Sequence, residues 1–178
     1  MLIRKVSLAD AQGIANVHVD TWRTTYEGII PTEFLNKLDY SERKNRWENK
    51  MRTENVVFVV ENEEGQIIGF ADTSRRENNL ELNSIDLTSL YLLEAYQGRG
   101  IGKLLMKTLF EHYKNQSYDK VYVDVLADNN TRYFYEYLGA KFVRNIKIKI
   151  GGKILDESTY VWESVNDVLE KLEINASL

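Results

Sequence analysis

A glycine-rich turn at the start of a helix constrains the fold of this chain more than any other feature. Gly98, Gly100 and Gly102 lie between a segment that alternates like a strand, Leu82 to Leu92, and an amphipathic stretch with helical spacing that ends near Asn115. Glycine lets neighbouring backbone N–H groups face a common point, and a helix N-terminus adds positive partial charge. The turn is therefore suited to hold a pyrophosphate.

Two common phosphate-binding motifs do not fit this turn. The dinucleotide fingerprint G-x-G-x-x-G requires glycine where the chain has Lys103 in one register and Leu105 in the other. The P-loop G-x-x-x-x-G-K-[ST] requires a glycine in place of Gln97 and a hydroxyl residue in place of Leu104. Both motifs are therefore excluded at this turn.

A third pattern, Q/R-x-x-G-x-G/A, fits at Gln97, Gly100 and Gly102 without adjustment. It resembles the pyrophosphate loop of the GCN5-related N-acetyltransferase (GNAT) superfamily. Residues 127–140 are similar to that family's N-x-x-A-x-x-F-Y-x-x-x-G-F segment, and residues 18–31 to the H-V-x-x-W-R-x-x-Y-x-G-x-x-P start of many bacterial members. The resemblance extends over about residues 1 to 162, and the three matches occur in the family's order.

The periodicity of the whole chain predicts a mixed α/β domain. Ser7 followed by Asp10 resembles a capping box at the start of the first helix, and Arg76 to Asn79 is typical of a polar turn. The resemblance implies a mostly antiparallel twisted sheet of about seven strands with four or five helices, splayed between the fourth and fifth strands. We expect one domain, residues 1–164, and a helical tail, 165–178, that packs on the body or on a partner. The expected strands are Leu2–Val6, Asn55–Glu61, Gln66–Arg75, Leu82–Leu92, Val121–Leu126, Lys141–Ile150 and Lys153–Trp162, and the expected helices are Leu8–Trp22, Thr32–Leu38, Ser41–Met51, Gly102–Asn115 and Asn130–Leu138.

Charge and composition exclude several classes of protein. The chain has 23 Lys and Arg against 27 Asp and Glu, with no basic cluster, so we expect no nucleic-acid partner. It has no cysteine and two isolated histidines, so we expect neither a disulfide scaffold nor a metal site. Met1 to Asp10 lacks a signal-peptide pattern and the longest apolar run, Val56 to Val60, is too short to cross a bilayer, so we expect a cytoplasmic protein without a membrane partner.

The resemblance implies that acetyl-CoA is the co-substrate and assigns residues to it. In the family, the strand before the loop pairs with the pantetheine arm; Leu90, Tyr91 and Leu92 occupy that position. A backbone N–H near Leu92 is placed to stabilise an oxyanion, and Asn129, or Asp128 by a shift of one residue, to bond the pantetheine arm. The pyrophosphate would be held by the loop residues, with Arg99 and Lys103 as charge partners: Gln97, Gly98, Arg99, Gly100, Ile101, Gly102 and Lys103.

Two proton transfers define the catalytic candidates. Tyr135 stands at the family's tyrosine position and would protonate the leaving thiolate, since a phenol has a reference pKa of about 10; the alternative is that it only packs and bonds CoA. An acceptor ammonium with a reference pKa of about 10.4 must lose a proton before it can attack. Asp124 and Asp86 are the candidate bases, with a water relay as the alternative to both.

The acceptor wall is expected from the first helical segments. The resemblance places Trp22, Tyr26 and Ile30 there, although Trp22 equally fits core packing. His18 fits a core histidine better than a base, and His112 is expected on the surface. The acyl group could also be longer than acetyl.

The function expected is transfer of an acetyl group to a primary amine of a small molecule or peptide. The alternative is a non-catalytic acyl-CoA-binding or sensing module on the same fold. The resemblance also implies a homodimer, in some members formed by exchange of the last strands, here Lys153 to Trp162.

Overall fold

The described part of the computed structural model comprises residues 1–53, 55–77 and 79–174, and it contains seven strands and six α-helices. The strands are β1 (Leu2–Lys5), β2 (Val56–Glu61), β3 (Ile67–Ser74), β4 (Ser84–Leu92), β5 (Lys120–Leu126), β6 (Lys141–Ile150) and β7 (Lys153–Trp162). The helices are α1 (Ala11–Thr25), α2 (Thr32–Asn36), α3 (Tyr40–Met51), α4 (Ile101–Asn115), α5 (Thr131–Tyr137) and α6 (Val165–Ile174).

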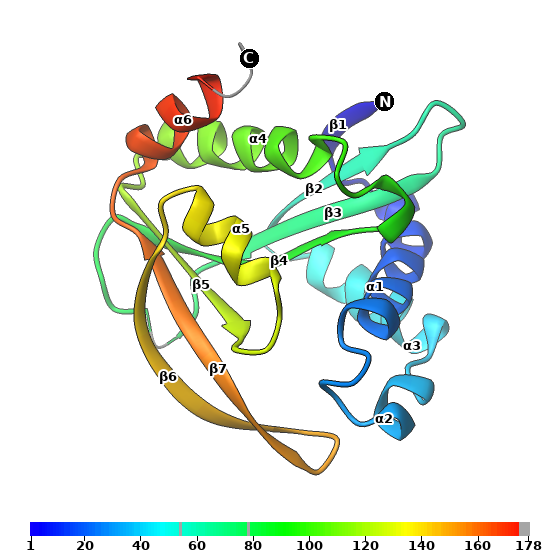
Figure 1. Cartoon of the computed structure of the whole chain (residues 1–178). Coiled ribbons are helices and arrows are strands. Elements are labelled where there is room, and N and C mark those ends of the chain that lie inside the picture. The colour runs from blue at the N-terminus through cyan, green and yellow to red at the C-terminus, as the bar shows by residue number, and fades with distance from the viewer. Residues whose placement is uncertain (54, 78, 175–178) are drawn as a thin grey trace.

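The strands form one twisted sheet in the order β1-β2-β3-β4-β5-β7-β6 (Figure 1). Of the strand pairs described, β4 and β5 run parallel and the others antiparallel. The predicted mixed α/β fold, with its mostly antiparallel sheet and its splay between the fourth and fifth strands, is confirmed.

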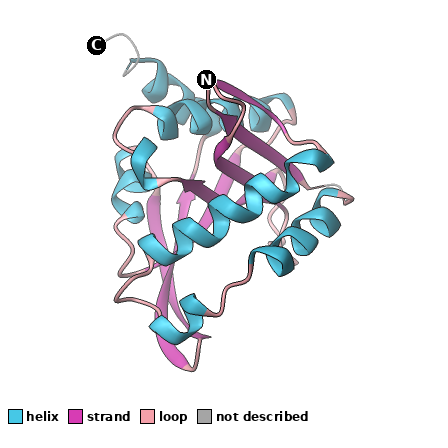
Figure 2. Cartoon of the chain, turned by 90° about the vertical axis from the view of Figure 1, so that its right-hand side faces the viewer, coloured by secondary structure: helices cyan, strands magenta, loops and turns pink. Residues whose placement is uncertain are grey.

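Helices cover both faces of the sheet, and each face has its own apolar core. Helices α1 and α3 lie across one face, as Figure 2 shows, where Ile14 and Trp47 pack against Phe70 of β3. Helices α4, α5 and α6 cover the other face, where Leu105 and Tyr135 belong to the largest buried cluster. The sheet is buried on both sides because alternate residues of its central strands are apolar toward both helical layers.

An extra residue bends β4 near its middle. Opposite β3, Thr73 pairs with Leu87 while Asp72 pairs with Ser89, so Thr88 has no counterpart on the neighbouring strand. A bulge of this kind bends the strand and increases its local twist. The second half of β4 therefore leaves the line of its first half.

The parallel pair β4–β5 opens beyond this bulge. The two strands are in register from their beginnings as far as Leu87 of β4 and Val123 of β5. Residues 88–92 and 124–126 continue as strands without pairing to each other. This interval is called the seam below, and it is the splay that the resemblance predicts.

Several element boundaries differ from those predicted, most of them by one to three residues. The predicted capping box is present, since the Ser7 backbone N–H donates to the Asp10 carboxylate at 2.7 Å, but Leu8–Asp10 forms a 3-10 turn and α1 begins after it. Helix α3 begins one residue before Ser41, because the Asp39 carboxylate caps it by accepting the Glu42 N–H at 2.8 Å. Strand β4 begins at Ser84 rather than Leu82.

The predicted tail is a helix that packs on the body of this chain. Helix α6 lies against α4, and its residues Val165, Val168 and Leu169 are buried in the largest core cluster. Residues 175–178 of the predicted tail lie outside the described residues. None of the helices in the described ranges has both the length and the apolarity needed to cross a bilayer.

His18 is a core residue, as predicted. Its Nδ1 accepts a hydrogen bond from Trp47 Nε1 at 3.1 Å, so the ring hydrogen is on Nε2. Burial, reinforced by the positive charges of Arg43, Lys50 and Arg46, lowers the pKa of His18 to about 3. The ring is therefore neutral at pH 7.

The low pKa of His18 predicts a loss of stability in mild acid. Between pH 6.5 and pH 3 the unfolded chain binds a proton at His18 that the folded chain does not, so the free energy of unfolding falls as the pH drops below about 6.5. This histidine alone accounts for about 2 kcal/mol between pH 7 and pH 5. We expect His18→Asn to be less stable at pH 7 and to lose less on acidification, as measured by urea unfolding at both pH values.

His112→Asn is the matched control, because His112 lies half-exposed on α4. It should keep most of the wild-type pH dependence. A His18→Asn variant whose stability falls with pH as steeply as the wild type would contradict the assignment.

Candidate active site

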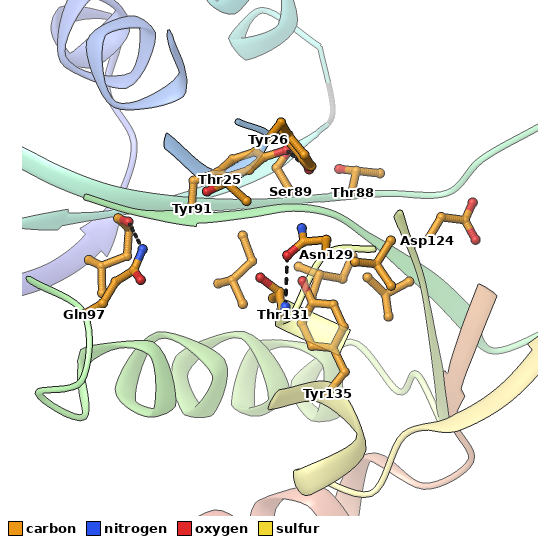
Figure 3. A pocket seen from close by; sticks show the side chains of 15 residues that line it. Thr25, Tyr26, Thr88, Ser89, Tyr91, Gln97, Asp124, Asn129, Thr131 and Tyr135 are labelled. Carbon is orange, nitrogen blue, oxygen red and sulfur yellow. Dashed lines mark hydrogen bonds between the residues drawn. The ribbon is translucent and has the colours of Figure 1, made fainter. Parts of the chain in front are cut away.

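A pocket occupies the seam between β4 and β5 and is bordered by α1 and α5 (Figure 3). Most of its lining comes from β4 and β5, chiefly from their unpaired halves, and the rest from the end of α1, the residue before the glycine turn and the start of α5. It is lined by Thr25, Tyr26, Leu87, Thr88, Ser89, Leu90, Tyr91, Leu92, Gln97, Val123, Asp124, Val125, Asn129, Thr131 and Tyr135.

Backbone groups of β4 point into the seam. The N–H of Leu93 donates to the carbonyl of Ile68 in β3 at 2.9 Å. Successive N–H groups of a strand point in opposite directions, so the N–H groups of Leu92 and Leu90 point away from β3 and toward the seam. The side-chain amide of Gln97 donates to the Leu92 carbonyl at 2.9 Å, as the dashed line in Figure 3 shows, and so ties the loop to the strand end.

The glycine turn forms an open cradle at the N-terminus of α4. Gly98 and Gly100 have φ of +71° and +79°, a conformation that side chains disfavour, and a Cβ at either position would meet no protein atom within 4 Å. Gly100 is the N-cap of α4, so the free N–H groups of the first helical turn follow it directly. A Cβ at Gly102 would lie 3.8 Å from the ring of Phe134, an ordinary van der Waals distance, so packing against α5 does not require glycine there.

The two cations of the predicted loop lie on aromatic rings beside it. The Arg99 guanidinium lies 5.6 Å from the centre of the Tyr96 ring, and the Lys103 ammonium lies 4.9 Å from that of Tyr137. Lys103 Nζ also donates to the Tyr137 hydroxyl at 3.2 Å. Neither residue forms an ion pair among the described residues, so both side chains are available to pair with an anion in the cradle.

Tyr135 and Asn129 reach the seam from the start of α5. The Tyr135 ring is buried against Trp162, with ring centres 5.4 Å apart, and its hydroxyl points into the pocket (Figure 3). Burial raises the pKa of this phenol well above its ordinary value, so it keeps its proton. Asn129 is buried, and its side-chain oxygen accepts the Thr131 N–H at 2.9 Å, whereas Asp128 is exposed. Of these two residues, Asn129 lines the pocket and Asp128 does not.

Trp22 does not line the pocket, but it forms a hydrogen bond with Tyr91, which does. Trp22 Nε1 donates to the Tyr91 hydroxyl at 3.0 Å, and the Tyr91 hydroxyl lies 3.3 Å from that of Tyr26. An indole N–H can only donate, so the Tyr91 oxygen accepts from Trp22, while either phenol can donate in the hydrogen bond between Tyr91 and Tyr26. Tyr26 and Asn129 both line the seam pocket. Ile30, the third residue predicted for the acceptor wall, is buried in the cluster that contains Tyr26.

Both predicted bases bind the same arginine. Asp86 accepts from Arg76 Nε at 2.9 Å and from Asn79 Nδ2 at 2.8 Å. Asp124 pairs with the guanidinium of Arg76 and accepts the Thr159 hydroxyl at 2.7 Å. Asp124 lines the seam pocket and Asp86 does not. Arg76 thus links β4 to β5 at the closed end of the seam, which is the end where the two strands still pair.

Several residues of the site give little signal in the sequence. Thr25, Thr88, Ser89 and Thr131 line the pocket, but small hydroxyl residues are common in turns and strands and do not stand out. Arg76 was expected only as part of a polar turn, because its two carboxylate partners are 10 and 48 residues away.

The fold and the site together define a class of protein. A sheet that opens between two parallel strands, next to a glycine cradle at a helix N-terminus, provides an extended ligand with unpaired backbone on one side and a pyrophosphate site at one end. This is the arrangement that the resemblance predicts for GNAT acyltransferases.

Comparison with known proteins agrees with this class. The family model described as "Acetyltransferase (GNAT) family" matches residues 18–140. The uncharacterized N-acetyltransferase YuaI of Bacillus subtilis (strain 168) is 34% identical over 164 residues, which are 92% of this chain and 94% of that protein. The spermidine N(1)-acetyltransferase of Thermoplasma acidophilum is 28% identical over 109 residues, or 58% of this chain and 65% of that protein.

A solved structure has the same fold. The PaiA N-acetyltransferase of Thermoplasma acidophilum, crystallised with coenzyme A, superposes with a TM-score of 0.69 at 22% identity, over 89% of this chain and 98% of that one. The chain belongs to the GNAT acetyltransferase family.

The Arg76 link generates a prediction about stability. Arg76→Met leaves the carboxylate of Asp86, whose side chain is 3% exposed, without its counter-ion. Breaking a buried ion pair from one side typically costs about 3 kcal/mol or more. We expect a loss of about 3 kcal/mol in the free energy of unfolding, measured by urea denaturation at pH 7.

The double variant Arg76→Met/Asp86→Asn should recover most of that loss, since it removes the uncompensated charge. Arg99→Met, on the exposed loop, is the control and should change stability little. Equal stability of Arg76→Met and wild type would show that the link contributes nothing.

Proposed function

We propose that this protein transfers the acetyl group of acetyl-CoA directly to a primary amine of a small molecule or peptide. The observation that carries the proposal is the seam itself: unpaired N–H groups of β4, a buried phenol aimed between the strands and a glycine cradle at one end. A ligand that combines a pyrophosphate with a long amide-containing arm satisfies all three features.

The residues fit coenzyme A. Its pyrophosphate would be held by backbone N–H groups from Gly98 to Lys103, and its arm by the seam-facing groups of Leu90 and Leu92 together with Asn129. Its thioester would supply an activated acetyl group. The PaiA N-acetyltransferase, which has the same fold, was crystallised with coenzyme A, and this supports coenzyme A as the ligand.

Tyr135 is the proposed acid. It retains its proton because burial raises its pKa, and its hydroxyl has no hydrogen-bond partner among the described residues, so its hydrogen remains available for the sulfur. A buried phenol that opens only to the pocket is better suited to donate a proton there than to exchange it with bulk water.

Of the two carboxylates predicted as the base, Asp124 is the better placed. It lines the seam, whereas Asp86 is enclosed by Arg76 and Asn79. It pairs with Arg76 and accepts the Thr159 hydroxyl, so protonation of Asp124 would remove its charge from the ion pair with Arg76. A water relay that ends in solvent leaves that ion pair intact.

The acceptor is proposed to enter beside Tyr26. The Trp22–Tyr91–Tyr26 hydrogen bonds leave the Tyr26 hydroxyl as the outermost member, facing the seam. In this proposal Trp22 positions Tyr26 through Tyr91 and does not itself contact the acceptor. The acceptor class covers polyamines and peptide amines, and the spermidine acetyltransferase relative supports the first of these.

The test is amine-dependent release of thiol from acetyl-CoA, with spermidine and an alanine-initiated peptide among the amines. We expect Tyr135→Phe to lower kcat by roughly 100-fold, the usual contribution of a positioned acid, while the Kd for CoA from calorimetry changes little.

Tyr133→Phe is the matched control, since Tyr133 lies on the same helix but is 53% exposed and bonds Arg132. It should behave as wild type. A wild-type protein that binds CoA but releases no thiol above the amine-free rate would instead be a non-catalytic acyl-CoA-binding module.

A further inference from the structure

One carboxylate near the proposed entrance of the acceptor, that of Glu157, belongs neither to the predicted site nor to the core. Glu157 lies on β7, directly opposite Leu126 of β5. Opposed residues of an antiparallel pair share a face of the sheet, and so do residues two apart along a strand. Glu157 therefore lies on the same face as Thr159, whose hydroxyl bonds Asp124, and as Leu155.

That face is the one that carries Tyr26. Leu155 and Leu126 are buried in one cluster with Tyr26 and Ile30. Glu157 lies between this cluster and the Thr159–Asp124 hydrogen bond. Burial raises the pKa of the Tyr26 hydroxyl, and the negative charge of Glu157 adds to that rise. It is thus at the side of the seam where the acceptor is proposed to enter.

The Glu157 carboxylate is half-buried and unpaired. Within residues 1–53, 55–77 and 79–174 it makes no hydrogen bond and no ion pair. A partly desolvated carboxylate without a partner costs stability. Contacts within the fold therefore do not explain a charged residue at this position, whereas binding of a cationic ligand would explain it.

The surroundings of Glu157 favour proton uptake. Burial raises the pKa of its carboxyl, and the charge of Arg76 opposes this more weakly. The charged and titratable groups that face it are Tyr122 and Asp124 of β5, Arg144 of β6, Arg76 of the β3–β4 loop and Tyr26 of α1. A carboxylate with a raised pKa is a stronger base than an ordinary glutamate.

We propose that Glu157 binds the ammonium of the acceptor and takes the proton that must leave before attack. This rests on the proposed function. The ammonium gives its first proton to Glu157, and the nitrogen lone pair then forms the C–N bond as the C–S bond breaks. Tyr135 protonates the departing sulfur, and the second proton of the nitrogen returns through water to the Tyr135 oxygen. Glu157 releases its proton to solvent, so one proton is produced per turnover.

This assignment also accounts for the state of Asp124. With Glu157 as the proton acceptor, Asp124 can keep its contacts with Arg76 and Thr159 throughout the reaction. Its charge then holds the closed end of the seam and adds a second anion near the acceptor.

The experiment compares kcat/KM for the amine between pH 6 and pH 10 in wild type, Glu157→Gln and Glu157→Asp. The assay is thiol release from acetyl-CoA with spermidine and with an alanine-initiated peptide. We expect Glu157→Gln to lose roughly 100-fold at pH 7 and to approach wild type near pH 10, where the free amine is abundant. Glu157→Asp should recover part of the loss, and the Kd for CoA should stay unchanged in both variants.

Asp156→Asn is the matched control. Asp156 is the adjacent residue of β7, points to the opposite face and pairs with Lys147 at 2.7 Å. It should leave the profile unchanged. A Glu157→Gln variant that follows the wild-type pH profile, or whose loss is the same at every pH, overturns the role as proton acceptor. A wild type without amine-dependent thiol release overturns the proposed function as well, so the two failures are distinct.

Discussion

The architecture of this protein depends on an interruption in backbone pairing. β4 and β5 pair only in their first halves, and the extra residue at Thr88 turns the second half of β4 away. Backbone N–H groups in a protein interior require partners, and those of Leu90 and Leu92 face a space that β5 has left. The fold therefore presents a short edge strand inside the molecule, where a ligand with amide groups can take the place of the missing strand.

The two ends of the seam differ in their electrostatic character. At the loop end, Gly98 and Gly100 expose backbone N–H groups at the start of α4, where the helix dipole favours an anion. At the closed end, Arg76 balances two carboxylates and keeps the strands together. In the proposed reaction, the anionic cofactor and the cationic acceptor are therefore expected at different ends of the seam.

The sequence predicted those parts of the fold that depend on local pattern. Strand and helix periodicity, the turn glycines and the Ser7–Asp10 capping box are local, and the glycine spacing distinguished this loop from other phosphate-binding loops. Contacts between distant segments could not be predicted in this way. The pairing of Arg76 with Asp124 and the position of Glu157 opposite Leu126 depend on strand register. Register is a property of the assembled sheet, and no short window of the sequence encodes it.

The most direct test of this account is a titration of the 15N-labelled protein with coenzyme A, followed by NMR at each backbone amide. If coenzyme A binds in the seam and at the glycine turn, the largest shifts occur at Leu90, Leu92 and residues 98–103, with little change at Ile85 and Leu87 in the paired half of β4. Shifts concentrated outside the seam and its loop, or no shifts at millimolar coenzyme A, would contradict it.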